Sequence, residues 1–316
     1  MKTCLVLGGN QFVGKAVASK LISKGYKVYI LNRGNHKAPL GSIQLIADRN
    51  NKKKLAEVLK GLTFDYVFDI SAYTPEQTKL VIEQLAGRVK HFLHISSATV
   101  YLDSQEFPLN EESAVGNNSI WGDYGFKKYL CEQALLKSFR EIDFPMTIFR
   151  PFYIYGPGNN HDRESYVFQR LITEAPIIIP GQGKNIVQFG YIDDLVNSLV
   201  RIAGEKKSFG EIYNISENRF ITMNGWVDTC ADIAGVNPKI VLVDAENEGF
   251  KAREWFPFRD IHLFGCTNKI QDQFGTISEH ALSEGLRKTF QQLNHKNLID
   301  EFSPLDVEKK ILFKRY

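Results

Sequence analysis

Val6-Leu7-Gly8-Gly9-Asn10-Gln11-Phe12-Val13-Gly14, near the start of the chain, is the stretch that decides the expected fold. An apolar run of strand type comes before it, and apolar residues recur at helical spacing after it. Gly8 allows a tight turn, Gly9 lets the backbone approach a pyrophosphate, and Gly14 permits close packing of helix on strand. Because the start of a helix also presents free N–H groups, the stretch predicts a nucleotide-binding turn.

Strand and helix patterns alternate along the first half of the chain, which predicts an α/β fold with a doubly wound parallel sheet of Rossmann type. The expected strands are 4–7, 27–31, 44–48, 66–70, 91–97 and 146–150. The alternation weakens after residue 150, so we expect a smaller, partly interleaved C-terminal α/β domain that binds the substrate. The expected nucleotide-binding domain comprises 1–165, with 189–212 returning to it, and the expected substrate-binding domain comprises 166–188 and 213–316.

The composition excludes several classes of protein. Of the 316 residues, 43% are hydrophobic and 24% are charged, which is ordinary for a globular protein. The net charge of +3 indicates no general affinity for polyanions. Four scattered cysteines form no Cys-x-x-Cys motif, so we expect reduced thiols and no metal site. We see neither a signal peptide nor a long apolar segment, and we therefore expect a cytoplasmic protein that makes no membrane contact.

Tyr124 and Lys128 lie four residues apart and share one face of an expected helix. A lysine ammonium beside a phenol stabilises the phenolate, which suits the tyrosine to exchange a proton with a substrate hydroxyl. A hydroxyl at the end of the fifth expected strand can hold the same substrate oxygen; Ser97 is the expected residue, with Ser96 and Thr99 as alternatives. Tyr-x-x-x-Lys also occurs by chance on surface helices, but the glycine turn and the order of the motifs favour an acid–base site.

With these motifs in this order, the chain resembles the extended short-chain dehydrogenase/reductase superfamily, the NAD-dependent epimerases and dehydratases of nucleotide sugars. The resemblance covers nearly the whole length. The matching features are Gly-Gly-x-x-Phe-Val-Gly at 8–14, the acid Asp48, Ser-Ala-Thr-Val-Tyr at 97–101, Tyr-x-x-x-Lys at 124–128, Arg-Pro-Phe-Tyr-Ile-Tyr-Gly-Pro-Gly at 150–158 and Phe-Gly-Tyr-Ile-Asp-Asp-Leu-Val at 189–196.

The resemblance implies a catalytic set of Ser97, Tyr124 and Lys128. It implies that Asp48 bonds the adenine amino group, that Ala72 lies against the adenosine half, and that other residues border the nicotinamide or its ribose. The implied cofactor-binding residues are Gly8, Gly9, Asn10, Gln11, Phe12, Val13, Gly14, Asn32, Arg33, Asp48, Ala72, Tyr124, Lys128, Pro151 and Tyr153. It further implies a nucleotide-sugar-like substrate and a homodimer that pairs through the helices that include the Tyr124 one.

Two departures from the family pattern concern the cofactor. The family's middle glycine is Gln11 here, so the turn can differ and bind the cofactor more weakly. The acid expected after the second strand for the ribose of NAD is replaced by Asn32-Arg33. Arg33 can pair with a 2′-phosphate, which favours NADP over NAD, or it can be a solvated loop charge.

A narrower likeness links the chain to an atypical branch of the superfamily, the chloroplast stem-loop-binding proteins and their bacterial relatives. It rests on Leu-Asn-Arg-Gly at 31–34, Asn-Ile-Ser at 214–216 and Phe-Pro-Phe-Arg-Asp-Ile-His-Leu-Phe at 256–264. Some members of that branch bind or cleave RNA and lack the tyrosine–lysine pair. Arg259, His262 and Thr99 are candidate substrate-binding residues here, although Arg259 can equally pair with Asp260 in a loop that only packs the C-terminal domain.

The favoured hypothesis is an NAD- or NADP-dependent epimerase/dehydratase-type oxidoreductase. The alternative is an RNA-binding or RNA-processing protein with a vestigial or regulatory nucleotide site, and RNA is an expected partner only under that alternative. A third hypothesis, a nucleotide-sensing scaffold without turnover, is supported only by Gln11. The retained Tyr124 and Lys128 favour the enzyme.

Overall fold

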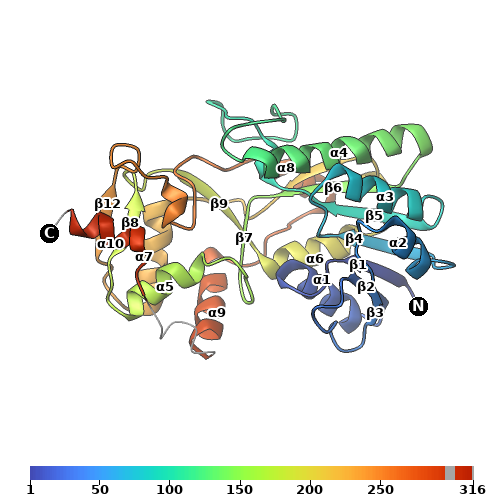
Figure 1. The fold of residues 1–316 in the computed structure, drawn as a ribbon, viewed down its shortest axis with the longest axis horizontal. Helices are drawn as coiled ribbons and strands as arrows, with labels where there is room; N and C mark the ends of the chain where they lie inside the picture. The colour runs from blue at the N-terminus through green and yellow to red at the C-terminus, as the bar shows by residue number, and fades with distance from the viewer. Residues whose placement is uncertain (296–302, 315–316) are drawn as a thin grey trace. The chain divides into compact units, whose positions relative to one another are not determined.

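The computed structural model describes residues 1–295 and 303–314, and the chain divides into two compact units (Figure 1). The expected boundaries differ from these units: 153–165 and 189–191 lie in unit 2 instead of the first domain, and 213–216 and 265–277 lie in unit 1 instead of the second. Unit 1 comprises Met1–Phe152, Ile192–Ser216 and Gly265–Ile277, and unit 2 comprises Tyr153–Tyr191, Glu217–Phe264 and Ser278–Tyr316.

Unit 1 is built on a seven-stranded sheet in the order β10-β6-β5-β4-β1-β2-β3, and every strand pair in it is parallel. The strand order reverses between β1 and β4, which is where open α/β sheets bind ligands at the carboxyl ends of their strands. The predicted doubly wound sheet is confirmed. Its strands are β1 (Thr3–Leu7), β2 (Lys27–Asn32), β3 (Ile43–Ile46), β4 (Phe64–Asp69), β5 (Val89–Ile95), β6 (Met146–Pro151) and β10 (Ile212–Ile215).

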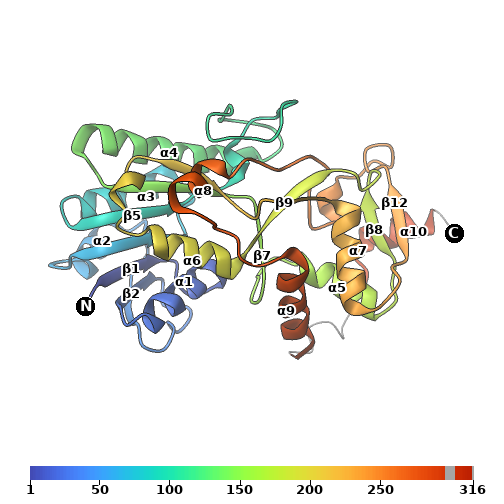
Figure 2. The same cartoon turned by 180° about the vertical axis from the view of Figure 1, so that it is seen from behind.

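Helices cover both faces of this sheet (Figures 1 and 2). On one face α1 packs with α6, and on the other α2 and α4 pack with α3. Side-chain caps begin two of them: Asn51 accepts from the Lys54 N–H, and Thr74 accepts from the Gln77 N–H. The helices of unit 1 are α1 (Phe12–Ser23), α2 (Lys52–Val58), α3 (Pro75–Leu85), α4 (Gly122–Ile142), α6 (Ile192–Ile202) and α8 (Asn268–Phe274), with short 3-10 turns at Ala98–Val100 and Lys206–Ser208.

Unit 2 contains a three-stranded sheet of order β11-β9-β7 and a two-stranded parallel sheet of β12 and β8. Large rings fill its core, including Trp226 stacked on Phe189 with ring centroids 3.9 Å apart. Its elements are β7 (Tyr153–Tyr155), α5 (Glu164–Ile172), β8 (Ile177–Pro180), β9 (Ile186–Tyr191), β11 (Phe220–Thr222), α7 (Met223–Ala234), β12 (Ile240–Val243), a 3-10 turn (Ala252–Glu254), α9 (Leu282–His295) and α10 (Asp306–Phe313).

Candidate active site

The turn after β1 depends on its three glycines. Gly8 has φ +92°, a conformation that side chains other than glycine's rarely adopt. A Cβ at Gly14 would lie 2.0 Å from the Gly8 carbonyl oxygen, and a Cβ at Gly9 would lie 2.9 Å from Ile30 Cγ2. The close packing inferred for Gly14 from the sequence is therefore present, with the start of α1 lying directly against the turn.

Gln11 stands in an extended conformation, with φ −131° and ψ 151°. Every residue type can adopt this backbone conformation, so the turn forms with Gln11 in the place of the family's middle glycine. The Gln11 side chain forms no capping bond, and no acidic residue occupies the first turn of α1. The next residue, Phe12, has φ +32°, and such strain persists where the surroundings enforce it, often at ligand sites.

Asn32, at the end of β2, is held by neighbouring side chains. Its Nδ2 donates to Asn10 Oδ1 at 3.0 Å, and its Oδ1 accepts from the Gly34 N–H at 2.7 Å and from Gln44 Nε2 at 2.9 Å. Arg33 is exposed and forms no ion pair with any residue in the described ranges. Gln44 was not singled out in the sequence, since only pairing between strands brings it to this corner.

The loops after β3 and β4 are joined by a chain of hydrogen bonds. Asp48 is exposed, and its Oδ1 accepts from the N–H and the Nδ2 of Asn50, both at 2.8 Å. Asn50 Oδ1 accepts from Gln77 Nε2 at 3.1 Å, and Gln77 Oε1 accepts from the Tyr73 N–H at 2.9 Å. Ala72, beside Tyr73, is fully buried. The loop that carries Asp48 is thus connected to the loop that carries Tyr73.

A buried ion pair lies beneath these loops. Arg49 donates to both carboxylate oxygens of Asp69, at 2.7 and 2.9 Å, and to Ser71 Oγ at 3.0 Å. Burial alone would raise the pKa of Asp69, but the Arg49 guanidinium holds that pKa well below its ordinary value. Ser71 in turn packs against the turn, because a Cβ at Gly8 would lie 2.6 Å from Ser71 Cβ. The pair fixes the strand ends around the glycine turn.

Tyr124 and Lys128 lie on α4 as the sequence predicted, but their exposure differs. The Tyr124 residue is 43% exposed, whereas Lys128 is 3% exposed. Lys128 Nζ donates to the Ile95 carbonyl oxygen at 2.8 Å, at the carboxyl end of β5. Burial lowers the pKa of Lys128, and the Asp69 carboxylate opposes that shift. The helix thus presents the phenol to solvent and buries the ammonium one turn below it.

The hydroxyl residues after β5 lie against the same helix. Ser97 Oγ accepts from the Thr99 N–H at 3.2 Å, and a Cβ at Gly125 would lie only 2.3 Å from the Thr99 carbonyl oxygen. The hydroxyl oxygen of Thr99 is buried, and no residue of the described ranges bonds it. Ser96, an alternative to Ser97 as the residue that holds the substrate oxygen, instead donates its Oγ hydroxyl to Glu132 Oε1 at 2.5 Å. This hydroxyl therefore has a structural partner.

Glu132, one helical turn after Lys128, belongs to a second buried ion pair. Arg150, on β6, donates to its two carboxylate oxygens at 2.7 and 3.0 Å. The Arg150 guanidinium also donates to Tyr101 Oη at 3.2 Å, and that hydroxyl donates to Asn214 Oδ1 at 2.6 Å. The network joins α4 to the ends of β5, β6 and β10. No local sequence pattern indicates it, because the partners lie far apart along the chain.

The remaining cofactor candidates fall in different units. Pro151 is buried at the end of β6 in unit 1. Tyr153 is 6% exposed and belongs to unit 2, where its ring lies 5.0 Å from that of Phe258 and 4.8 Å from the Arg163 guanidinium. Burial raises the pKa of Tyr153, and the positive charges of Arg163 and Arg259 oppose the rise.

Two further candidates lie on the segment 259–262 of unit 2. His262 Nδ1 accepts from the Ile186 N–H at 3.0 Å, which binds the ring to the start of β9. Asp260 Oδ1 accepts from Asn185 Nδ2 at 2.5 Å. Burial lowers the pKa of Arg259, and the charge of Arg253 acts in the same direction. The segment therefore has a packing role, and it also brings guanidinium groups close to one another.

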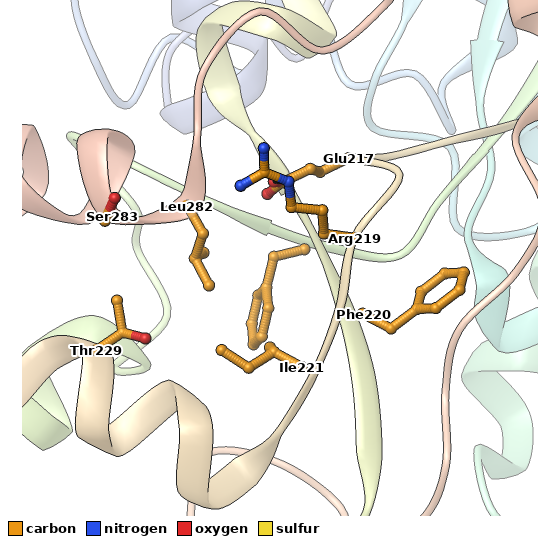
Figure 3. A pocket seen from close by; sticks show the side chains of 8 residues that line it. Glu217, Arg219, Phe220, Ile221, Thr229, Leu282 and Ser283 are labelled. Atoms are coloured by element: carbon orange, nitrogen blue, oxygen red, sulfur yellow. Dashed lines mark ion pairs between the residues drawn. The ribbon is translucent and has the colours of Figure 1, made fainter.

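Unit 2 also contains a pocket of about 230 Å³ (Figure 3). Apolar side chains line its interior, and a guanidinium and a carboxylate, Arg219 Nε and Glu217 Oε1, lie 3.7 Å apart beside it. The lining residues are Phe189, Glu217, Arg219, Phe220, Ile221, Thr229, Leu282 and Ser283. Except for Phe189, which belongs to the motif at 189–196, none of them stood out in the sequence, since they come from four separate segments.

Among the residues that the structure describes, none of the helices has the length and apolar composition that a membrane span requires. The same residues include no group of three His, Cys, Asp or Glu side chains that could hold a metal ion.

The sequence profile of the NAD dependent epimerase/dehydratase family matches residues 4–216. The chain is 31% identical over 307 residues to the chloroplast stem-loop binding protein of 41 kDa b of Arabidopsis thaliana, covering 92% of this chain and 78% of the relative. It is 28% identical over 322 residues to a UDP-N-acetyl-alpha-D-glucosaminuronate decarboxylase of Bacillus cytotoxicus, covering 92% and 97%.

Solved structures share the fold at low sequence identity. A dTDP-glucose 4,6-dehydratase of Bacillus anthracis, in complex with NAD, has a TM-score of 0.80 at 16% identity and covers 94% of this chain and 98% of its own. A UDP-glucose 4-epimerase of Thermotoga maritima, with UDP-glucose, has a TM-score of 0.80 at 20% identity and covers 93% and 99%. The likeness confirms the predicted fold class.

Proposed function

Because the chain belongs to the NAD-dependent epimerase/dehydratase family, we propose that it is an epimerase, dehydratase or reductase that acts on a nucleotide sugar or a similar hydroxylated compound through Ser97, Tyr124 and Lys128. The family and the enzyme class predicted from the sequence are confirmed. The observation that carries the finer proposal is the position of Tyr124, exposed on α4 above the buried Lys128 and beside the segment that carries Ser97.

The residues around the glycine turn fit a nicotinamide dinucleotide. The N–H groups at the start of α1 have no side-chain cap from Gln11 and no acidic neighbour in the first turn, so they suit a pyrophosphate. Asp48 is exposed for the adenine, and the backbone at Gly8 and Gly9 can approach the phosphates. When bound, the nicotinamide would accept hydride from the substrate carbon and, in an epimerase, give it back to the other face.

The catalytic roles follow from the exposure of each group. Tyr124 would take the proton of the substrate hydroxyl, since its side chain is accessible from solvent. Lys128 would stabilise, through its positive charge, the phenolate form in which Tyr124 accepts that proton, and the Asp69 carboxylate supports the charge of Lys128. Ser97 would bond the substrate oxygen and so orient the carbon that reacts. Thr99 is a further candidate, because its buried hydroxyl oxygen is bonded by no residue in the described part of the chain.

The choice between NAD and NADP depends on Arg33 in this proposal. An arginine at the end of β2 can form two parallel hydrogen bonds with a 2′-phosphate. Asn32, which occupies the place of the expected acid, is already held by Asn10 and Gln44 and brings no negative charge. Both features favour NADP.

The guanidinium groups of unit 2 favour an anionic substrate. Arg163, Arg253 and Arg259 all act on the pKa of the Tyr153 phenol, so their charges lie close to one residue. A cluster of positive charge of this kind suits the diphosphate of a nucleotide sugar. We further propose a homodimer that pairs through α4, as the resemblance to the family implies.

Replacing Tyr124 by Phe tests the mechanism. The variant is expected to lose about 10²- to 10⁴-fold in turnover, the usual contribution of a general acid–base group, while its affinity for the dinucleotide stays unchanged. Turnover would be measured with the purified chain, NAD⁺ or NADP⁺ and a series of nucleotide sugars, and binding by calorimetry. Tyr129→Phe on the same helix is the matched control. Full activity in the Tyr124 variant would rule out the assigned role.

An RNA-binding function is the alternative, and its support is the name of the chloroplast relative. The retained Tyr124 and Lys128 and the family match favour the enzyme. The same calorimetric experiment with a structured RNA distinguishes the two. Tight RNA binding that weakens steeply with salt, together with no dinucleotide affinity, would favour the alternative.

A further inference from the structure

Tyr73 contacts both members of the predicted tyrosine–lysine pair. Its ring centroid lies 6.1 Å from that of Tyr124, with the planes inclined at 50°. The Lys128 ammonium lies 5.6 Å from the centroid of the Tyr73 ring, within the range of a cation–π contact. Tyr73 follows β4 at the point where the strand order of the sheet reverses, and 55% of the residue is exposed. An aromatic ring thus lies beside two groups that the chemistry requires.

The position of Tyr73 is fixed by its backbone. Its N–H donates to Gln77 Oε1, and Gln77 Nε2 donates to Asn50 Oδ1. Asn50 is bonded to Asp48, the residue assigned to the adenine. The backbone that carries the ring is therefore held by the same loops that would hold the other end of the dinucleotide.

We propose that Tyr73 is a positioning residue of the active site, whose ring covers the Lys128 ammonium and keeps it beside the Tyr124 phenol. The assignment rests on the proposed function of that pair. Lys128 is 3% exposed, and its Nζ is bonded to the Ile95 carbonyl oxygen. The face of the Tyr73 ring provides a second contact for the charge. Removing the ring frees the ammonium to move towards water, while the Ile95 carbonyl remains.

Chemical labelling of lysines by acetic anhydride, quantified by mass spectrometry, measures this cover directly. In the 316-residue chain, Tyr73→Ala is expected to raise the labelling rate of Lys128 by roughly 2- to 30-fold, the factor that corresponds to the loss of one cation–π contact. Tyr73→Phe keeps the ring and is expected to preserve the protection of Lys128. Lys137 on the same helix is exposed and serves as the internal reference. Because Tyr73 is half-exposed, the thermal midpoint should stay unchanged.

Two outcomes would overturn the proposal: unchanged labelling of Lys128 in Tyr73→Ala, or equal deprotection in Tyr73→Phe and Tyr73→Ala. The same experiment separates this inference from the proposed function. Added NAD⁺ or NADP⁺ should protect Lys128 in the unsubstituted protein if the dinucleotide lies over the pair. Absence of that protection would contradict the proposed cofactor site, whereas the effect of Tyr73→Ala in the protein without dinucleotide would still decide the role of the ring.

Discussion

Two buried regions, one in each unit, are stabilised by different interactions. Beneath the candidate site of unit 1, the ends of β3, β4 and β6 and the helix α4 bring charged side chains together, with Arg49 paired to Asp69 and Arg150 paired to Glu132. At the three-stranded sheet of unit 2, the centre is a set of rings around Trp226. A buried ion pair holds two charged side chains in one orientation and keeps both ionised, whereas packed rings mainly fill volume. Substitutions in the two regions should therefore act through different physical effects.

The loss of Trp226 gives the largest effect expected in unit 2. Trp226→Ala should lower the free energy of unfolding by about 3–5 kcal/mol, because it leaves a cavity beside Phe189. Trp226→Phe should cost less. It keeps a ring against Phe189, and within the described residues the indole N–H has no hydrogen-bond partner to lose. Urea unfolding measures the stability of both variants. An equal loss of unfolding free energy in the two would contradict the idea that this region is stabilised by the volume of its packed rings.

Arg150→Met is the corresponding change in unit 1. It keeps much of the volume but leaves the Glu132 carboxylate buried without its partner, which should cost about 3–5 kcal/mol. Lys127→Met is the matched control, since the Lys127–Asp123 pair is exposed and 3.1 Å long; its loss should cost less than about 1 kcal/mol. If both variants unfold at the same urea concentration, the interior of unit 1 does not depend on charge pairing as described.

Unit 2 also buries a carboxyl group, that of Glu164, so aromatic rings are not its only buried groups. Glu164 accepts from the Gly156 N–H at 2.8 Å and from Asn159 Nδ2, and burial raises its pKa to about 7. Between about pH 4.5 and 7 the native state keeps a proton that the unfolded state has released, so stability should fall as the pH rises, by at most about 3 kcal/mol.

The measurement for Glu164 is urea unfolding across this pH range. The difference in unfolding free energy between the unsubstituted protein and Glu164→Gln should decrease steadily from pH 4.5 to 7.5, because the amide does not titrate. A difference that is independent of pH would show that Glu164 is ionised normally in the folded protein.

The smallest effect concerns Arg33, an exposed residue. Arg33→Ala should weaken NADP⁺ binding roughly tenfold, about 1.4 kcal/mol, and leave NAD⁺ binding nearly unchanged. Lys24→Ala, at the far end of α1, controls for the loss of one surface charge. Equal weakening of both dinucleotides would mean that Arg33 contacts no 2′-phosphate.

The sequence alone determined the features that depend on near neighbours in the chain. Gly8 and Gly14 predicted the turn because Gly8 adopts a positive φ and a Cβ at Gly14 would meet the Gly8 carbonyl oxygen, only six positions away. The spacing of Tyr124 and Lys128 predicted a shared helix face. The alternation of strands and helices predicted a parallel sheet, and with it the edge where strand ends meet.

Only the tertiary structure decided which distant residues surround that pair. Asp69 lies 20 positions from Arg49, Glu132 lies 18 positions from Arg150, and no local pattern joins either pair. In the sequence, Tyr73 is an ordinary loop residue. Only the pairing of β4 with β5 in the folded chain places it against α4. Burial is also a property of the whole fold, and it separates the exposed Tyr124 from the buried Lys128. The sequence specifies which side chains are present. The crossovers between parallel strands decide which distant side chains meet, and therefore which of them are buried and which are exposed to water.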